Sequence, residues 1–143
     1  MKKRCRNIYR IARKSAGYTQ EQAAEILHVS PRTLSDYESG KSVPPDDVVC
    51  RMIEVYKADW LAYKHLKQTE IGNRYLPNID STDLAKSVLR LQKEVRDFQV
   101  ISNEIIDIAC QGMIKEHDKW RSIVEKINGM VGAALSVVFH QTG

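Results

Sequence analysis

Apolar residues recur at helical spacing through the N-terminal half of the chain, and this spacing predicts five short helices. They are expected at residues 5–16, 20–27 and 31–39, after Pro45, and from Asp59 onwards. Helices this short are not stable alone in water, so the five must pack together. We therefore predict a compact all-α domain over residues 1–68. Trp60 and Tyr63 are expected in its core, although stacking on nucleic-acid bases is an alternative role for such rings.

The ends of the second and third helices carry the strongest local signals. Thr19 is a hydroxyl N-cap, and Gln22 three residues later completes a capping box. Ser30 is a second N-cap, and Pro31 occupies the first helical position, where its missing N–H costs nothing. Gly40 ends the third helix. The sequence thus predicts two short helices joined by an abrupt turn.

The second half of the chain shows a different pattern. Residues 69–81 are predicted as a linker laid against a surface, because Gly72, Asn73, Pro77 and Asn78 interrupt the helical period. Beyond an N-cap at Ser81 or Thr82, apolar positions alternate in steps of four and three, as in a coiled-coil or bundle seam. The main seam positions are Leu84, Val88, Leu91, Val95, Phe98 and Ile105 and, after a break near Gly112, Trp120, Val124, Ile127 and Val131.

Residues 82–143 are accordingly predicted as an oligomerisation region of two long helices, the second from about residue 115 to 139. A hairpin and one long bent helix both fit the pattern. The apolar stripes are wider than a single hairpin can cover, which favours a homodimer whose hairpins form a four-helix bundle, with a tetramer as a further possibility. The alternatives are a monomer whose C-terminal helices pack back on the first domain, and a surface for another protein.

Charge is concentrated where the two short helices lie. Residues 1–41 hold nine Lys/Arg and four Asp/Glu, a net +5, whereas residues 42–143 hold thirteen and fourteen, a net −1. A basic excess confined to one domain is typical of duplex binding, although a solvated basic N-terminus gives the same count.

Several functions lack the residues they need. Three widely spaced cysteines form no metal-site pair and are expected as reduced thiols in the cytoplasm. The basic N-terminus lacks the apolar run of a signal peptide, and the longest apolar stretch, 130–139, is far short of the ~20 residues that span a bilayer. His117 is interpreted as a surface residue, and no phosphate loop or nucleophile motif occurs. We therefore predict no enzyme activity, cofactor, metal or membrane partner.

The stretch Thr19–Gly40 resembles the helix-turn-helix of the phage repressor-like (Cro or XRE type) DNA-binding family. The matching features are T-Q at the start, Ala24 at the helix crossing, Val29 after the turn, and the segments S-P-R-T-L and Y-E-S-G-K. The resemblance covers roughly residues 7–67. One position departs from the family: the turn residue that is often Gly is His28 here, and His is among the residues that tolerate the left-handed conformation.

The third helix is expected to face inward through Leu34 and Tyr37 and outward through its polar residues. Arg32 is the preferred base reader, because a guanidinium matches guanine O6 and N7 with about 1–3 kcal/mol of discrimination; a plain phosphate contact is the alternative. Asp36 is expected either to accept from cytosine N4 or to orient Arg32, one turn away. Pro31 offers only apolar contact, for example to a thymine methyl group.

The resemblance implies further roles. It places Pro31, Arg32 and Asp36 at base-facing positions, and it implies phosphate contacts for Gln20 and Lys41. It also implies a structural ion pair between Arg13 and Glu38. The full predicted sets are Pro31, Arg32, Thr33, Ser35 and Asp36 for bases, and Lys14, Gln20, Ser30 and Lys41 for phosphates.

These observations predict a sequence-specific transcription regulator of a bacterium, phage or mobile element. It is expected to bind the major groove of double-stranded DNA as a dimer or higher oligomer, and as a repressor more than an activator. The alternative is a protein-interaction adaptor or antitoxin-like module built on a helix-turn-helix fold.

Overall fold

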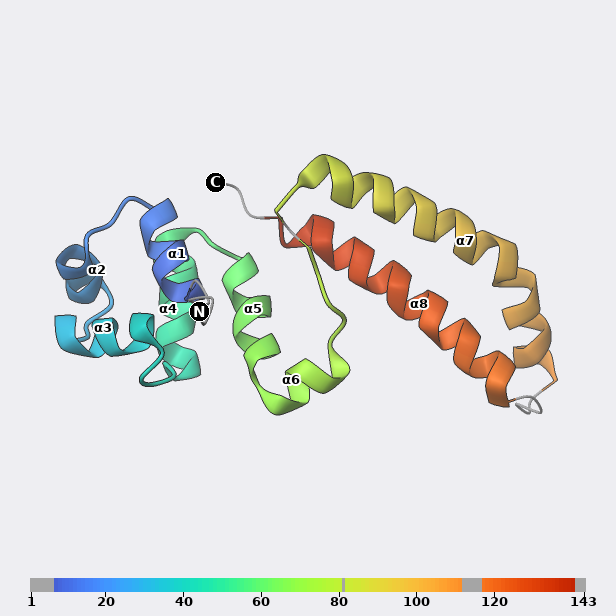
Figure 1. Cartoon of the computed structure of the whole chain (residues 1–143), viewed down its shortest axis with the longest axis horizontal. Coiled ribbons are helices and arrows are strands. Elements are labelled where there is room, and N and C mark those ends of the chain that lie inside the picture. Colours follow the sequence, from blue (N-terminus) through green and yellow to red (C-terminus); the bar gives the residue numbers. More distant parts are fainter. Residues whose placement is uncertain (1–6, 81, 112–116, 141–143) are drawn as a thin grey trace, which may run out of the picture. The chain divides into compact units, whose positions relative to one another are not determined.

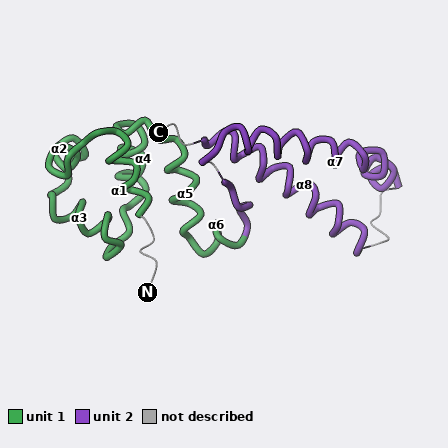
Figure 2. The backbone as a smooth tube through the Cα atoms, turned by 45° about the horizontal axis from the view of Figure 1, so that its top comes forward, with its two compact units in different colours: residues 1–74, 141–143 green, residues 75–140 purple. Residues whose placement is uncertain are grey.

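A computed structural model describes residues 7–80, 82–111 and 117–140. Eight helices, and no strands, occur in these ranges, so the all-α prediction is confirmed. The chain divides into two compact units, one that ends at Arg74 and one from Tyr75 to His140 (Figures 1 and 2). Within the described ranges, no helix is both long and apolar enough to cross a membrane.

Six of the described helices belong to the first unit, the last of them except for its final residue, Tyr75: α1 (Ile8–Ser15), α2 (Gln20–Ile26), α3 (Pro31–Ser39), α4 (Asp46–Tyr56), α5 (Trp60–Gln68) and α6 (Glu70–Tyr75). Helix α1 is central, because it contacts α3, α4 and α5, while α2 packs on α3. Leu27, Leu34, Met52 and Leu61 are fully buried between these helices. Each such side chain stabilises the fold by about 1.5–3 kcal/mol through burial. Trp60 and Tyr63 are also buried, as expected of core aromatics.

Helix α1 begins later than predicted. Asn7 is its N-cap, and its side-chain oxygen accepts from the backbone N–H groups of Tyr9 and Arg10. The predicted start at residue 5 lies outside the described residues. Asp59 precedes α5 without capping it through its side chain, and Leu66 on α5 is half exposed.

The predicted linker contains a helix instead of irregular chain in its first half. Helix α6 covers Glu70–Tyr75 and includes Gly72 and Asn73, which were expected to break the helical period. Gly72 is buried where α6 follows α5, and a Cβ there would overlap the carbonyl group of Leu66. This glycine therefore permits a close approach between consecutive helices.

The second unit is a helical hairpin. Helices α7 (Leu84–Cys110) and α8 (His117–Val138) pack side by side in opposite directions, so the alternative of one long bent helix is wrong (Figures 1 and 2). Asp83 is the N-cap of α7, since its carboxylate accepts from Lys86 N–H at 3.0 Å; Thr82 is not. Ser81, Gly112 and the predicted helix start at residue 115 lie outside the described residues.

The hairpin uses only part of the predicted seam. Leu91, Phe98, Ile105, Trp120, Val124 and Ile127 are at least half buried, whereas Leu84, Val88, Val95 and Val131 are exposed. In a pair of antiparallel helices, each helix buries one stripe of the other. The buried stripe of α7 is centred on Ser87, Leu91, Phe98, Ile101 and Ile105. The heptad pattern is wider than this contact, which leaves one edge of it at the surface.

Candidate nucleic-acid interface

The turn between α2 and α3 is fixed by local hydrogen bonds. The capping box of α2 is complete: Gln22 N–H donates to Thr19 Oγ1 at 3.2 Å, and Thr19 N–H donates to Gln22 Oε1 at 3.0 Å. His28 adopts the left-handed conformation with φ 56°, and the next residue, Val29, donates to the Ala24 carbonyl at 3.0 Å. His28 thus takes the conformation in which the family often has glycine.

Ser30 caps the start of α3. Ser30 Oγ accepts from Thr33 N–H at 3.0 Å and lies 2.7 Å from Thr33 Oγ1, while Pro31 occupies the first turn. A capping hydroxyl of this kind stabilises a helix by about 0.5–2 kcal/mol. Gly40 ends α3 in the left-handed conformation, φ 78°. The limits of α3 agree with the prediction.

The predicted base-contacting residues gather on one side of α3. Pro31, Arg32 and Ser35 are exposed, while Thr33 and Asp36 lie half buried at the edge. The inner side is formed by the fully buried Leu34 and by Glu38; Tyr37, expected inside, is half buried.

A buried ion pair holds α3 against α1. The guanidinium of Arg13 donates to Glu38 through Nε at 2.6 Å and through Nη2 at 2.9 Å, and its Nη1 donates to the Tyr18 carbonyl at 2.7 Å. The Glu38 side chain is only 3% exposed. Its hydrogen bond, more than its charge alone, raises the pKa of Arg13. Asn7 adds a second tie, from its side-chain amide to the Tyr37 carbonyl at 2.8 Å.

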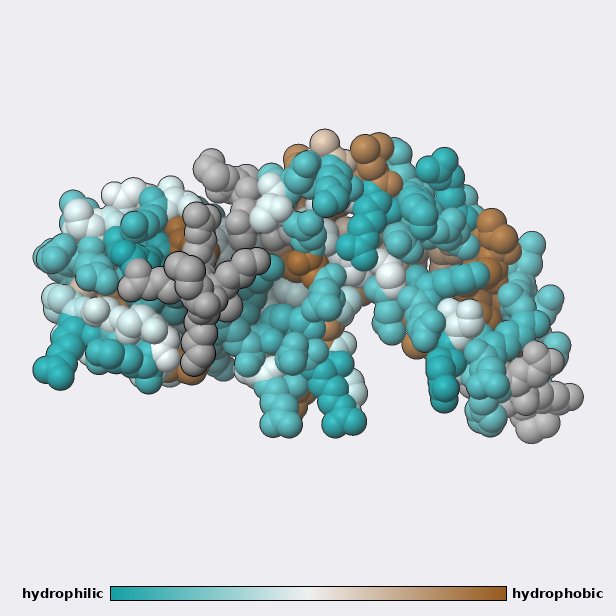
Figure 3. Space-filling model, viewed as in Figure 1, coloured by the Kyte–Doolittle hydropathy of each residue, from teal (hydrophilic) through white to brown (hydrophobic). Residues whose placement is uncertain are grey.

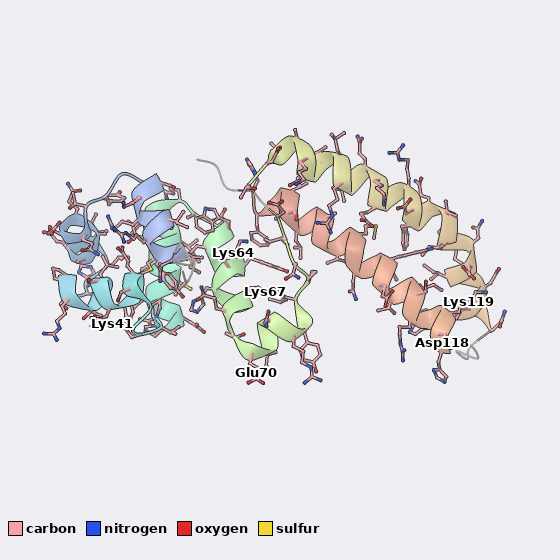
Figure 4. The ribbon with its side chains drawn as sticks, in the orientation of Figure 1. Lys41, Lys64, Lys67, Glu70, Asp118 and Lys119 are labelled. Carbon is pink, nitrogen blue, oxygen red and sulfur yellow. The ribbon has the colours of Figure 1, made fainter. Side chains whose placement is uncertain are left out.

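The predicted phosphate-contacting residues occupy three elements. Lys14 is exposed on α1, and Gln20 and Ser30 begin α2 and α3. Gln20 uses one N–H of its amide to donate to Glu38 Oε2 at 2.9 Å, which ties α2 into the buried pair. Lys41 follows α3 directly and is exposed (Figure 4).

Asp36 pairs with Lys41, not with Arg32. The distance from Asp36 Oδ1 to Lys41 Nζ is 3.4 Å, and both side chains reach the surface. The backbone N–H of Lys41 also donates to the Asp36 carbonyl at 3.0 Å. The pairing places a cation beside the carboxylate that would otherwise repel a phosphate, and it leaves the Arg32 side chain without Asp36 as its orienting partner.

A second polar cluster ties α1 to the later helices, and sequence reasoning did not find it. The buried His65 on α5 has Nδ1 2.7 Å from Tyr9 Oη, and its Nε2 lies 3.1 Å from Asp46 Oδ1 at the start of α4. Tyr9 Oη also lies 3.2 Å from Gln68 Oε1. Burial raises the pKa of Tyr9 to about 12. Partners this far apart in sequence leave no local signal.

Potential metal ligands are dispersed among the described residues. Over the ranges that the structure describes, no group of three or more His, Cys, Asp or Glu side chains is positioned to hold a metal ion. Cys50 and Cys110 are exposed free thiols.

Comparison with known proteins agrees with this geometry. Residues 10–61 match the family described as helix-turn-helix. The HTH-type transcriptional regulator ImmR of Bacillus subtilis (strain 168) is 32% identical over 89 residues, which is 60% of this chain and 63% of that protein. No solved structure matches the chain.

The helix-turn-helix domain thus covers α2, α3 and most of their packing partners, from within α1 to the start of α5. The match does not include α6 or the α7–α8 hairpin. The match includes residues 19–40, so their resemblance to a helix-turn-helix is confirmed.

Proposed function

We propose that the protein is a sequence-specific DNA-binding transcription regulator that inserts α3 into the major groove. The observation that carries this proposal is the contrast between the two sides of α3. Its inner side is locked by Leu34 and by the Arg13–Glu38 pair, while its first turns present Pro31, Arg32 and Ser35 to solvent. A rigid helix with polar side chains at its N-terminal end is the geometry that reads base edges. A related protein is named as an HTH-type transcriptional regulator.

Sequence discrimination in this proposal falls mainly on Arg32. It is the one cation among the predicted base-contacting residues, and a bidentate contact to guanine is worth about 1–3 kcal/mol. Thr33 contributes less, since its hydroxyl lies 2.7 Å from the capping Ser30 hydroxyl. Asp36 is partly neutralised by Lys41, so it is available to accept from cytosine N4.

Phosphate contacts would set the register on the duplex. The exposed ammonium groups of Lys14 and Lys41 supply charge, while Gln20 and Ser30 lie at helix N-termini, where N–H groups favour anions. Two cationic contacts in each copy give a slope of log K against log salt of roughly −2 per copy.

Two copies acting together are part of the proposal. One small module contacts a single half-site, and specific affinity usually requires a second. Residues 1–68 would bind DNA, residues 82–143 would bring the copies together, and residues 69–81 would connect them. Repression is favoured over activation, because occupying a promoter is sufficient to block it, whereas activation needs a further contact.

The test is selection of duplexes from a random library by the full chain, followed by affinity measurements over a salt series. We expect one enriched sequence family with two half-sites, and affinity that falls steeply as salt rises. Enrichment of no sequence would contradict the proposal. DNA affinity that is negligible at low salt would favour the alternative, an adaptor or antitoxin-like module that uses the hairpin to bind protein.

A further inference from the structure

One face of the α7–α8 hairpin is already covered by its own chain. The segment 77–80 crosses it: Asp80 N–H donates to Ser136 Oγ at 3.1 Å, and Ser87 Oγ donates to the Asp80 carbonyl at 2.9 Å. A Cβ at Gly132 would lie 3.3 Å from atoms of Pro77 and Asn78, so the backbone of α8 is closely covered there.

The opposite face of the hairpin is an exposed apolar strip. Successive residues of a helix are rotated by about 100°, and this rotation places the α7 members beside the buried stripe of α7, on its side away from the 77–80 segment. Its α8 members lie on the side of that helix away from Gly132 and Ser136. The strip consists of Leu84, Val88, Val95 and Ile106 on α7 and Val131 and Val138 on α8, all 36–69% exposed.

The antiparallel packing places both rows of the strip on one face. Viewed along the hairpin, successive residues of α7 advance in one rotational sense and those of α8 in the other, because the helices are antiparallel. In each helix the strip residues follow the buried stripe in the direction of increasing residue number, so both rows lie on the same side of the hairpin. A contact on the covered face agrees with this arrangement of the two rows. There Glu94 of α7 packs over Gly129 of α8, and its carboxylate would lie 3.0 Å from a Cβ at Gly129. Figure 3 shows hydrophobic surface emerging along α7 between polar regions.

Charge is arranged so that two copies of this face can meet. Helical spacing puts Gln92, Gln99 and Asn103 beside the α7 row of the strip. The charged residues Lys86, Arg90, Lys93 and Asp97 lie about half a turn away. In a two-fold contact each residue meets the same surface on the other copy, so like charges at the border would repel. Along α7 the residues next to the strip are uncharged and Arg96 lies beyond Asn103, so this border reduces that repulsion.

We infer that this strip is the docking surface for the same strip of a second copy, and that the two hairpins form a four-helix bundle. The biological purpose of this contact rests on the proposed function. The contact would be the surface that brings two DNA-binding domains together. The half-buried row between the two edges, which includes Leu91, Phe98 and Val124, becomes the centre of the bundle. The six strip residues differ from the predicted seam in adding Ile106 and Val138.

A charge placed in the strip tests this inference, and the same helix offers a matched control. Val95→Glu lies in the strip, whereas Val100→Glu introduces the same substitution on the outer side of α7, where Val100 is 82% exposed. Sedimentation equilibrium of the full chain without DNA gives the mass of each. We expect about twice 16.4 kDa for the parent and for Val100→Glu. For Val95→Glu we expect a dimer dissociation constant raised by roughly tenfold or more, because the contact would bury an unpaired charge.

A parent mass of one copy overturns the inference, as does a Val95→Glu variant as dimeric as the parent. Circular dichroism checks that the helices persist. Should Val95→Glu lose helix, Val131→Glu on α8 provides the same test from the other row. The readout does not involve DNA, so a monomeric parent that still selects one duplex sequence would refute the docking surface alone, and a dimer that selects none would refute the proposed function alone.

Discussion

Replacing Glu38 by alanine removes the acceptor on which three helices converge. The Glu38 carboxylate accepts two hydrogen bonds from Arg13 and one from Gln20, and its side chain is only 3% exposed. The substitution leaves the Arg13 guanidinium buried, with the Tyr18 carbonyl as its remaining acceptor in this cluster. Removing one partner of a buried ion pair costs about 3–5 kcal/mol.

A loss of this size is a large part of the stability of a small domain, which is about 5–15 kcal/mol. Urea unfolding measures it directly. With a slope of about 1–2 kcal/mol per molar, typical of a small unit, the midpoint should fall by roughly 1.5–5 M. Trp60 is buried in the first unit and Trp120 lies in α8, so a Trp120→Phe background makes fluorescence report on the first unit alone.

The exposed Glu54 on α4 supplies the control. Glu54→Ala removes the same side chain from the surface and should change the free energy of unfolding by no more than about 0.5 kcal/mol. If Glu38→Ala cost less than about 1 kcal/mol, or no more than Glu54→Ala, the pair would not be what fixes α3 against α1. In that case α3 would not be held as a rigid element for presentation to DNA.

Two further predictions concern the first unit. His28→Gly should raise the free energy of unfolding of this unit by roughly 0.5–1 kcal/mol, measured by thermal melts. His28 has φ 56° and is exposed, and glycine accepts that conformation without steric strain. An unchanged or lower melting midpoint would contradict this. Burial raises the pKa of Tyr9 to about 12, so its contribution is complete below the unfolded pKa of about 10 and is lost as pH rises from there towards 12. Over that window the parent should lose about 2 kcal/mol more stability than Tyr9→Phe. Equal losses in urea titrations would refute the role of buried Tyr9 in this pH dependence.

The limits of α2 and α3 could be predicted because their signals are local. Thr19, Ser30 and Gly40 each act on backbone groups within a few residues, so the sequence contains both partners of every cap. The heptad pattern likewise indicates two long helices beyond the first domain, because their stripes are formed by each helix itself.

Other features depend on contacts between distant segments. Gly72 is expected to break a helix, yet it lies within α6. The position needs a glycine because a Cβ there would overlap the Leu66 carbonyl. The Tyr9–His65 contact joins residues far apart in the chain, so no spacing predicts it. Heptad spacing also cannot tell which edge of a stripe the partner helix covers; burial in the hairpin separates Val95 from Phe98.

The site itself was reached by two routes. Arg32 follows from helical spacing, since Leu34 fixes the inner side of α3 and leaves Arg32 outside. The Arg13–Glu38 pair came only from the resemblance to a family, because nothing in the spacing of an Arg and a Glu on different helices indicates a contact. The pairing of Asp36 with Lys41 depends on the tertiary structure, since the left-handed turn at Gly40 brings Lys41 back beside α3.

The central claim is that Arg32 reads a base in the major groove. Its most direct test is the affinity of the full chain and of Arg32→Ala for the selected duplex, for the same duplex with the contacted guanine replaced, and for unrelated DNA. We expect Arg32→Ala to weaken binding to the selected duplex by roughly 5- to 150-fold, to lose discrimination at that guanine, and to leave binding to unrelated DNA nearly unchanged. Lys14→Ala, a phosphate contact in this account, should weaken all three alike. Equal weakening of all three duplexes by Arg32→Ala, or none, would contradict the claim.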